Sequence, residues 1–268
     1  MKKWFLVSLM SILVVGLLAA CGTSNNGGET AGSGNEDENG DKKVLVMGTS
    51  ADYPPFEYID TEKGEEIIGF DIDLAKAITE ELGYELKVQD IDFGSLITAM
   101  DAGNIDLILA GMTPTEERLE QVDFTDVYYT AHHMVVSLKD SKIEKVEDLE
   151  GKTVGAQLGS IQLEQAEEIN KTIKLKKIED RDRIPQLIQE LKTGRIDAAI
   201  IEDTVMKGFM EKDSDLTGFN LDTDEKGSAI ALPKDSELTE EFNRVLGEMK
   251  ENGELDKLIM KWFGGEEE

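Results

Sequence analysis

Two different spacings of apolar residues alternate along this 268-residue chain. Residues 44–47 form a short apolar run followed by the polar and glycine residues 48–50, which predicts a buried strand and its exit loop. In residues 70–82 apolar side chains recur at helical spacing as far as Gly83, which predicts a helix that ends there. Residues 86–91 predict another strand. Because helices and strands continue to alternate, we expect an α/β fold with mostly parallel sheets.

One segment of this pattern occurs twice. Residues 96–109 and 187–200 carry apolar residues at matching positions and the same Gly-x-Ile-Asp sequence, at a constant offset of 91 residues. Each copy predicts a helix, a glycine that ends it and an apolar strand. The repeat favours two similarly built lobes; the alternative is a chance similarity between ordinary α/β units.

The repeat also indicates where a ligand would bind. Ligands of open α/β sheets bind beyond the carboxyl ends of the strands, which here are residues 110–113 and 201–203. If the two lobes face each other, both segments border one cleft. Residues 154–160 repeat the strand and loop of residues 44–50, and Ser160 is suited to cap the helix that follows, leaving amides free for an anion.

Composition narrows the classes of partner and chemistry. The chain has 28 Lys and Arg against 57 Asp and Glu, a net charge of −29, so we expect a well-solvated surface and no nucleic-acid partner. Its single Cys excludes an intrachain disulfide, a cysteine-based zinc site and a C-x-x-C pair. The only two histidines, His132 and His133, are adjacent and would point to opposite faces of a strand, so they would not share an ion. Without an H-E-x-x-H, G-x-S-x-G or P-loop motif, we expect no metal, no cofactor and no catalytic residue.

The N-terminus reads as an export signal. Two lysines precede an apolar run over residues 4–18, which is too short to span a bilayer comfortably and fits a secretory signal peptide over residues 1–20. The run ends in Leu-Ala-Ala-Cys21, which resembles the lipobox of bacterial lipoproteins, where the thiol of the Cys carries diacylglycerol. An ordinary signal peptide with an incidental Cys is the alternative. Residues 21–41 would then be the lipidated Cys and a flexible, Gly-rich and acidic tether.

The predicted cleft contains the groups that a zwitterion needs. An arginine fork suits a carboxylate, and a carboxylate suits an ammonium, so together they indicate an amino-acid site. Each residue also has a structural explanation: Arg118 as a surface ion pair, Tyr53 and Phe93 as core, and Glu202 as a solvated carboxylate. The candidates are Arg118, Glu202, Thr113, Ser160, Tyr53 and Phe93.

Several separated motifs carry a resemblance to a known family. They are residues 48–56 (GTSADYPPF), 69–75 (GFDIDLA), 110–118 (AGMTPTEER), 122–125 (VDFT) and the C-terminal 254–263. With the lipobox, they resemble the polar amino-acid-binding family of ABC-transporter solute-binding proteins over essentially all of residues 44–264. Residues 127–130, 157–162 and 200–203 are similar, more narrowly, to the arginine-binding extracellular lipoproteins of Gram-positive bacteria.

The resemblance implies a two-lobed, periplasmic-binding-protein-like fold. Each lobe would be a mostly parallel sheet flanked by helices, with hinge strands near 131–135 and 223–228. Lobe 1 would comprise residues 42–131 and lobe 2 residues 132–224. Residues 225–268 would return to lobe 1.

The resemblance also implies roles for individual residues. Arg118 would hold the ligand α-carboxylate, with the Thr113 hydroxyl and the amides at Ser160 and Ile161. Glu202 and the backbone of Ala110 and Gly111 would hold the α-ammonium, and Tyr53 and Phe93 would sandwich the ligand side chain. Two positions depart from the family pattern: the ammonium acid is often Asp rather than Glu, and Ser50 stands where several basic-ligand binders have Asp. The acceptor for a cationic ligand side chain therefore stays open between Gln157, Asp52 and a cation–π contact.

The expected function is that of an extracytoplasmic binding lipoprotein. It would be a monomer on the extracellular face of the cell membrane, anchored by lipid on Cys21, and would deliver a polar amino acid, arginine or another basic one, to an ABC permease. Glutamine or another neutral polar amino acid is the alternative ligand. More distant alternatives are a dehydratase on the same scaffold, for which Glu202 is the central acid, and a sensor module.

Overall fold

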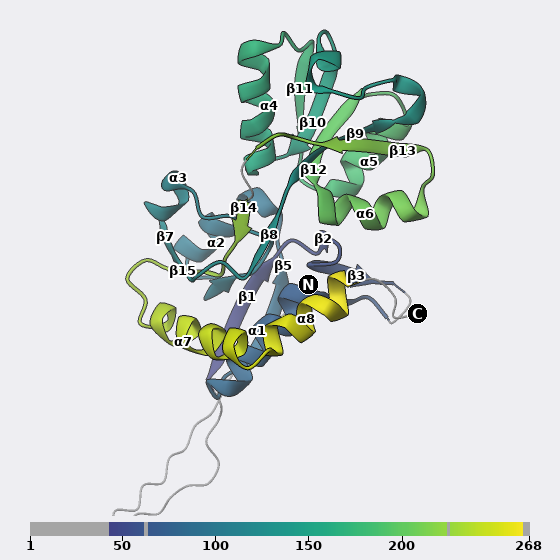
Figure 1. The fold of residues 1–268 in the computed structure, drawn as a ribbon. Helices are drawn as coiled ribbons and strands as arrows, with labels where there is room; N and C mark the ends of the chain where they lie inside the picture. Colours follow the sequence, from purple (N-terminus) through teal and green to yellow (C-terminus); the bar gives the residue numbers. More distant parts are fainter. Residues whose placement is uncertain (1–42, 62–63, 224–225, 265–268) are drawn as a thin grey trace, which may run out of the picture. The chain divides into compact units, whose positions relative to one another are not determined.

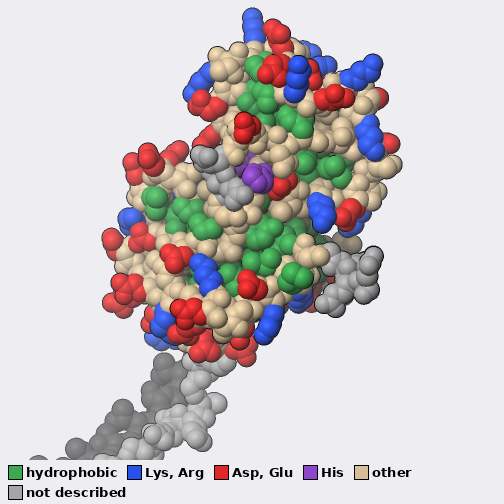
Figure 2. Space-filling view, in the orientation of Figure 1, with side chains coloured by type: hydrophobic (Ala, Val, Ile, Leu, Met, Phe, Trp, Pro, Cys, Tyr) green, Lys and Arg blue, Asp and Glu red, His purple; other side chains and the backbone are tan. Residues whose placement is uncertain are grey.

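The computed structural model describes residues 43–61, 64–223 and 226–264. The predicted signal peptide, Cys21 and the tether lie outside these residues. Within them, no helix is both long enough and apolar enough to cross a bilayer. Acidic and basic side chains are interspersed over the face shown in Figure 2, as the composition predicts for a solvated surface.

The first lobe is built on a five-stranded sheet in the order β5-β1-β6-β15-β7. Its central strand β1 (Val44–Thr49) is parallel to β5 (Glu85–Asp90) and β6 (Leu107–Ile108). The strand β15 (Ala231–Pro233), from late in the chain, lies antiparallel between β6 and β7 (Val122–Phe124). The predicted strands at 44–47 and 86–91 are confirmed within two residues.

The second lobe is built on a sheet in the order β11-β10-β12-β9-β13. Here the central parallel strand is β10 (Thr153–Gln157), between β11 (Lys177–Arg181) and β12 (Ala198–Glu202). The strands β9 (His133–Leu138) and β13 (Leu216–Asn220) complete the sheet in antiparallel pairing.

Helices cover these sheets in Figure 1. In the first lobe α1 (Phe70–Glu81), α7 (Leu238–Glu251) and α8 (Glu254–Phe263) pack together, while α2 (Leu96–Asp101) contacts β1 and β6. Met47 belongs to the core with α1 and Val46 packs in the core with α2, because successive side chains of a strand face opposite sides. In the second lobe α4 (Ile161–Thr172), α5 (Ile184–Lys192) and α6 (Asp203–Lys212) contact the sheet.

Short elements complete the fold. The strands β2 (Asp52–Tyr53), β3 (Glu57–Asp60) and β4 (Glu66–Ile68) form a small sheet. Two others, β8 (Tyr129–Ala131) and β14 (Lys226–Ser228), pair with each other where the chain passes between the two large sheets. The remaining helices are α3 (Glu116–Leu119) and the 3₁₀ turns η1 (Phe93–Ser95), η2 (Lys139–Ser141) and η3 (Val146–Leu149).

The internal repeat has equivalent packing in the two sheets. A Cβ added to Gly48 of β1 would lie 2.4 Å from Ile105, and one on Gly155 of β10 would lie 2.7 Å from Ile196, the same position in the second copy of the repeat. Only glycine lets these side chains cross the central strand so closely. The aspartate of each Gly-x-Ile-Asp motif accepts a hydrogen bond from a central-strand amide at 2.8 Å: Asp106 from Val46, and Asp197 from Thr153.

Candidate functional site

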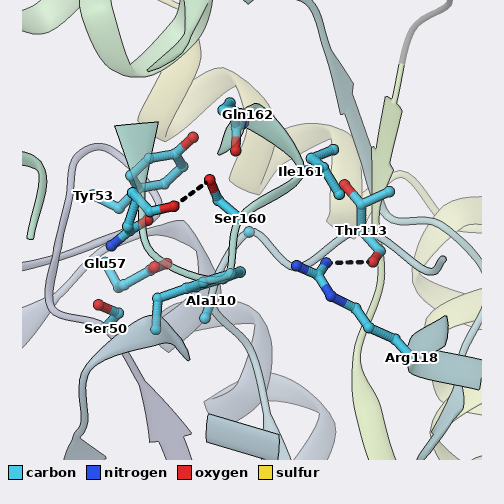
Figure 3. Close-up of a pocket in the computed structure, with 12 residues that line it drawn as sticks. Ser50, Tyr53, Glu57, Ala110, Thr113, Arg118, Ser160, Ile161 and Gln162 are labelled. Carbon is cyan, nitrogen blue, oxygen red and sulfur yellow. Dashed lines mark hydrogen bonds between the residues drawn. The ribbon is translucent and has the colours of Figure 1, made fainter. Parts of the chain in front are cut away.

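One pocket brings together residues from both lobes (Figure 3). Ten of the eleven ligand-binding residues predicted from sequence line it, and the eleventh, Glu202, is hydrogen-bonded to a lining residue. The space enclosed is about 20 Å³, room for one or two water molecules. The lining elements must therefore separate before anything as large as an amino acid can enter. The ten residues are Ser50, Tyr53, Phe93, Ala110, Gly111, Thr113, Arg118, Gln157, Ser160 and Ile161.

Arg118 is held in place by backbone groups. The Thr115 hydroxyl caps α3 by accepting from the Arg118 amide at 3.2 Å. The guanidinium donates to the carbonyl oxygen of Thr113 at 2.7 Å and to that of Gly159, in the second lobe, at 2.9 Å. Its central carbon lies 5.4 Å from the centre of the Phe93 ring, within cation–π range. These contacts leave a fixed cation facing the pocket.

The surface ion-pair explanation for Arg118 is wrong. The residue is only 7% exposed, and within the described part of the chain no carboxylate forms a salt bridge with it. Burial lowers the pKa of Arg118, while the charges of Glu164 and Glu117 act in the opposite direction. A guanidinium that is buried without a carboxylate is suited to receive one from a ligand.

Glu202 ends β12 and is also buried rather than solvated, at 7% exposure. Its two carboxylate oxygens accept hydrogen bonds from the Tyr53 hydroxyl at 3.0 Å and from Thr204 at 3.2 Å. Burial raises the pKa of Glu202 to about 8, although both hydrogen bonds lower it. A ligand cation would stabilise the ionised form. The bond to Tyr53 also joins the two lobes.

Tyr53 and Phe93 are both buried, as the core explanation expects, and both also line the pocket, as a ligand contact would require. Tyr53 is 7% exposed and Phe93 9%. A Cβ on Gly111, whose φ is +57°, would lie 3.3 Å from the Tyr53 ring. The Tyr53 ring therefore lies directly against the backbone at Gly111.

The predicted cap at Ser160 is confirmed. Its hydroxyl accepts from the Leu163 amide at 3.2 Å and donates to the Gln157 carbonyl at 2.7 Å. It directly precedes α4, as a residue that caps the start of a helix must. The first amides of a helix have no partner within the helix, so Ile161 and Gln162 at this end line the pocket with donors that suit an anion. Gln157 lines it too, with its amide nitrogen donating to the Asp182 carbonyl at 3.0 Å.

Asp52, one of the candidate acceptors for a cationic ligand, is occupied elsewhere. It accepts from the Ser50 hydroxyl at 2.9 Å and from the Ile184 amide at the start of α5 at 2.6 Å. Arg183 lies 3.8 Å from it and pairs with Asp90 at 2.7 Å, so these groups join the lobes beside the pocket. Burial raises the pKa of Asp52 to about 6.

Two lining residues were missed by the sequence analysis: Glu57 and Gln162. Glu57 immediately follows the Pro-Pro-Phe motif and begins β3, and it is completely buried. Burial raises the pKa of Glu57 well above its ordinary value, and the neighbouring carboxyl of Asp71 raises it further. Asp71 accepts from the Gly111 amide and the Tyr128 hydroxyl, both at 2.9 Å. An acid after an aromatic residue gives no signal of burial. Only the position of Glu57 directly after the motif of residues 48–56 could have drawn attention to it.

Next to the lining residues Phe93 and Ser160, the two lobes meet backbone to backbone. A Cβ placed on Gly159 would lie 2.9 Å from the Cα atom of Gly94, which belongs to the first lobe. A Cβ on Gly94 would lie 3.1 Å from the Leu158 carbonyl oxygen. Within the described residues, no three His, Cys, Asp or Glu side chains are grouped as a metal ion would require.

Comparisons with known proteins agree with this geometry. Residues 45–265 match the family described as bacterial extracellular solute-binding proteins, family 3. The chain is 54% identical to the arginine-binding extracellular protein ArtP of Bacillus subtilis (strain 168), over 99% of this chain and all of that protein. An ancestral arginine-binding protein bound to arginine is 38% identical with a TM-score of 0.78, covering 83% of this chain and 99% of its own. The substrate-binding protein AbpA of Streptococcus pneumoniae bound to L-arginine is 37% identical with a TM-score of 0.76, covering 82% and 94%.

Proposed function

The chain belongs to family 3 of the bacterial extracellular solute-binding proteins, and from that premise we propose that it captures arginine between its two lobes and delivers it to an ABC importer. The observation that carries this proposal is the pair of buried ionisable groups at one pocket, Arg118 from the first lobe and Glu202 from the second. A guanidinium binds an α-carboxylate through two parallel hydrogen bonds, and a carboxylate binds an α-ammonium.

Seven other residues that line the pocket have a place in this arrangement. The Thr113 hydroxyl and the amides at Ser160 and Ile161 assist Arg118 with the α-carboxylate. The backbone at Ala110 and Gly111 assists Glu202 with the α-ammonium, while Tyr53 and Phe93 flank the ligand side chain. The close relation to an arginine-binding protein supports arginine over a neutral polar amino acid such as glutamine.

Capture requires the lobes to move. The enclosed space is too small for an amino acid, and the lining comes from both lobes. We place lobe 1 at residues 42–131 and 225–268, and lobe 2 at 132–224, with the hinge at β8, β14 and the start of β9. The paired strands β8 and β14, where the chain crosses between the sheets, support this assignment.

The location of the protein is part of the proposal. A signal peptide over residues 1–20 directs export, and lipid on Cys21 anchors a monomer on the extracellular face of the membrane. Residues 21–41 act as a tether. The extracellular family supports an extracytoplasmic site, and the Leu-Ala-Ala-Cys21 sequence supports the anchor.

We favour binding over catalysis. The raised pKa of Glu202, about 8 because of burial, fits the acid that a dehydratase would need. The same carboxyl, however, is the partner that an α-ammonium requires opposite Arg118, and an intact zwitterion clamp favours binding over turnover. Incubation of the protein with candidate amino acids, followed by a search for products, distinguishes the two functions.

The test of binding is a thermal-shift screen of the protein against the twenty amino acids, followed by calorimetry. A ligand that binds only the folded state raises the melting temperature. Arginine is expected to give the largest rise, with lysine or another basic amino acid next. No rise with any amino acid would refute the proposal, and a largest rise with glutamine would transfer it to a neutral ligand.

A further inference from the structure

We infer that Glu57 is the acceptor for the positively charged end of the ligand side chain, and that this residue makes the site select a guanidinium or ammonium over a neutral isostere. The inference rests on the proposed function, because it extends the same pocket to the group that gives specificity. Neither Ser50 nor Asp52 then has to fill this role.

The position of Glu57 suits an acceptor at the far end of the ligand. Glu57 begins β3 and pairs with Tyr53 of β2, so both residues lie together at the pocket. In Figure 3 its carboxyl group lies on the side of the pocket away from Arg118. A ligand whose α-carboxylate is held by Arg118 would therefore direct its side chain towards Glu57.

The hydrogen bonding of Glu57 is incomplete. Within the described residues, neither carboxyl oxygen accepts from an N–H or O–H donor, although the side chain is completely buried. The neighbouring Asp71 carboxyl can bond to it only when one of the two acids is protonated. The nearby donors serve other acids, since the Tyr53 hydroxyl bonds to Glu202 and the Tyr128 hydroxyl bonds to Asp71. An unpartnered buried carboxyl is costly, and a ligand that brings N–H donors would remove that cost. A guanidinium presents two parallel donors in the geometry that a carboxylate accepts.

The electrostatic surroundings also favour a cation. Glu57 faces Asp71 from α1, Asp52 from β2 and Glu202 from β12, all acids whose charges raise its pKa in addition to the effect of burial. The hydroxyls of Tyr53 and Tyr128 are the other titratable groups that interact with it. Arg118 is the cation lining this pocket, and it is engaged by carbonyl groups on the opposite side. A ligand cation would enter a cluster of acids in which Arg183 lies near Asp52, but within the described residues no Lys or Arg forms a salt bridge with Glu57, Asp71 or Glu202.

The other candidate acceptors are less suitable. Asp52 is outside the pocket lining and accepts from Ser50 and Ile184. Gln157 lines the pocket but is neutral, and its amide nitrogen already donates to Asp182. The face of Phe93 is already next to the Arg118 guanidinium.

The test compares arginine with citrulline, which has the same shape but a neutral urea group in place of the guanidinium. Calorimetry of the unchanged protein should show a preference for arginine of at least about 30-fold, as for loss of one partner from a buried charge pair. The Glu57→Gln variant should lose that preference, with citrulline affinity changed by less than about threefold. The measured quantity is the ratio of the arginine affinity to the citrulline affinity in each variant. Because both ligands require the same closure of the lobes, a general effect on closure cancels in this ratio.

Two controls separate Glu57 from its surroundings. Glu190→Gln makes the same change at another buried glutamate, which pairs with Arg181 outside the pocket, and should leave the ratio unchanged. Asp52→Asn should also leave it unchanged. An unaltered ratio in Glu57→Gln, or loss of the preference in Asp52→Asn instead, would overturn the inference.

A direct observation keeps the inference testable even if the Glu57→Gln variant does not fold. In a crystal structure of the unchanged protein with arginine, a guanidinium nitrogen should lie within about 3.2 Å of a Glu57 carboxyl oxygen. A guanidinium held by another group would overturn the inference while leaving the proposed function intact. If the unchanged protein binds neither arginine nor citrulline, the proposed function fails and this inference fails with it.

Discussion

Replacement of Arg118 by lysine keeps one positive charge but removes the planar fork of the guanidinium. The fork now donates to Thr113 and Gly159 from separate nitrogens, at 2.7 and 2.9 Å, and lies over the Phe93 ring. A lysine ammonium can neither reproduce both directions nor present two parallel donors to a carboxylate.

The magnitude follows from burial of the pair that Arg118 would form with the ligand. Loss of one partner from a desolvated charge pair costs about 2–5 kcal/mol, which corresponds to about 30-fold to several-thousand-fold in affinity. Because lysine retains the charge, we expect arginine affinity to fall at least about tenfold. If Arg118 contributed no more than an exposed ion pair does, the effect would be about 0–1 kcal/mol.

The assay is titration calorimetry with arginine, accompanied by circular dichroism to show that the fold is retained. Arg244→Lys is the matched control, because Arg244 is an exposed residue that pairs with Glu248 on α7. The Arg244→Lys variant should bind arginine with the same affinity as the unchanged protein. If Arg118→Lys also binds as tightly as the unchanged protein, Arg118 does not hold the α-carboxylate, and the residue roles implied by the family resemblance fail with it.

Three other predictions concern the anchor, closure and pH. Cys21→Ala should release the protein into the medium or leave it unprocessed; unchanged membrane retention on fractionation would refute a lipid anchor. Small-angle scattering should give a smaller radius of gyration with saturating arginine, and an unchanged profile would contradict a two-lobed clamp unless the free protein is already closed. The melting temperature of the ligand-free protein should fall between about pH 5 and 8, because a carboxyl whose folded pKa is raised, about 8 for Glu202, stabilises the fold below its unfolded pKa and loses that contribution as pH rises. Glu202→Gln should reduce this slope, whereas an identical slope would mean that Glu202 is not the group responsible.

The fold could be predicted largely because each lobe repeats one local pattern. The spacing of apolar residues predicted β1, α1 and β5 nearly to their ends. The repeated Gly-x-Ile-Asp motif indicated equivalent units. The physical reason for the repeat is that Asp106 and Asp197 each accept a hydrogen bond from an amide of the central strand of their sheet. The insertion of β15 between β6 and β7 has no local signal, since strand order depends on where a distant segment returns.

Sequence motifs predicted which residues lie at the site. They did not predict the burial or the hydrogen-bond partners of those residues, because both depend on tertiary packing. Glu202 was expected at a strand end and Arg118 in the same cleft. Their burial could not be read from their sequence neighbours, and the surface explanations for both were wrong. Asp52 was considered as a ligand acceptor, but it bonds to an amide 132 positions away in the chain. Glu57 was missed because its burial arises from the packing of β3, α1 and the pocket together.

The glycine contact beside the pocket bears on how quickly a ligand leaves. Gly94 and Gly159 meet backbone to backbone, and the side chain nearest to a Cβ placed on Gly94 is that of Leu158. Parting this seam therefore separates few interlocked side chains and exposes little apolar surface. At about 25 cal/mol per Å² of apolar surface, such a seam adds little to the barrier for opening. The residence time of a ligand then depends on the polar bonds that bridge the lobes, through Arg118, Tyr53 and Arg183, and on those that the ligand itself makes. A carrier built in this way can hold one amino acid for long and release another quickly through the same opening.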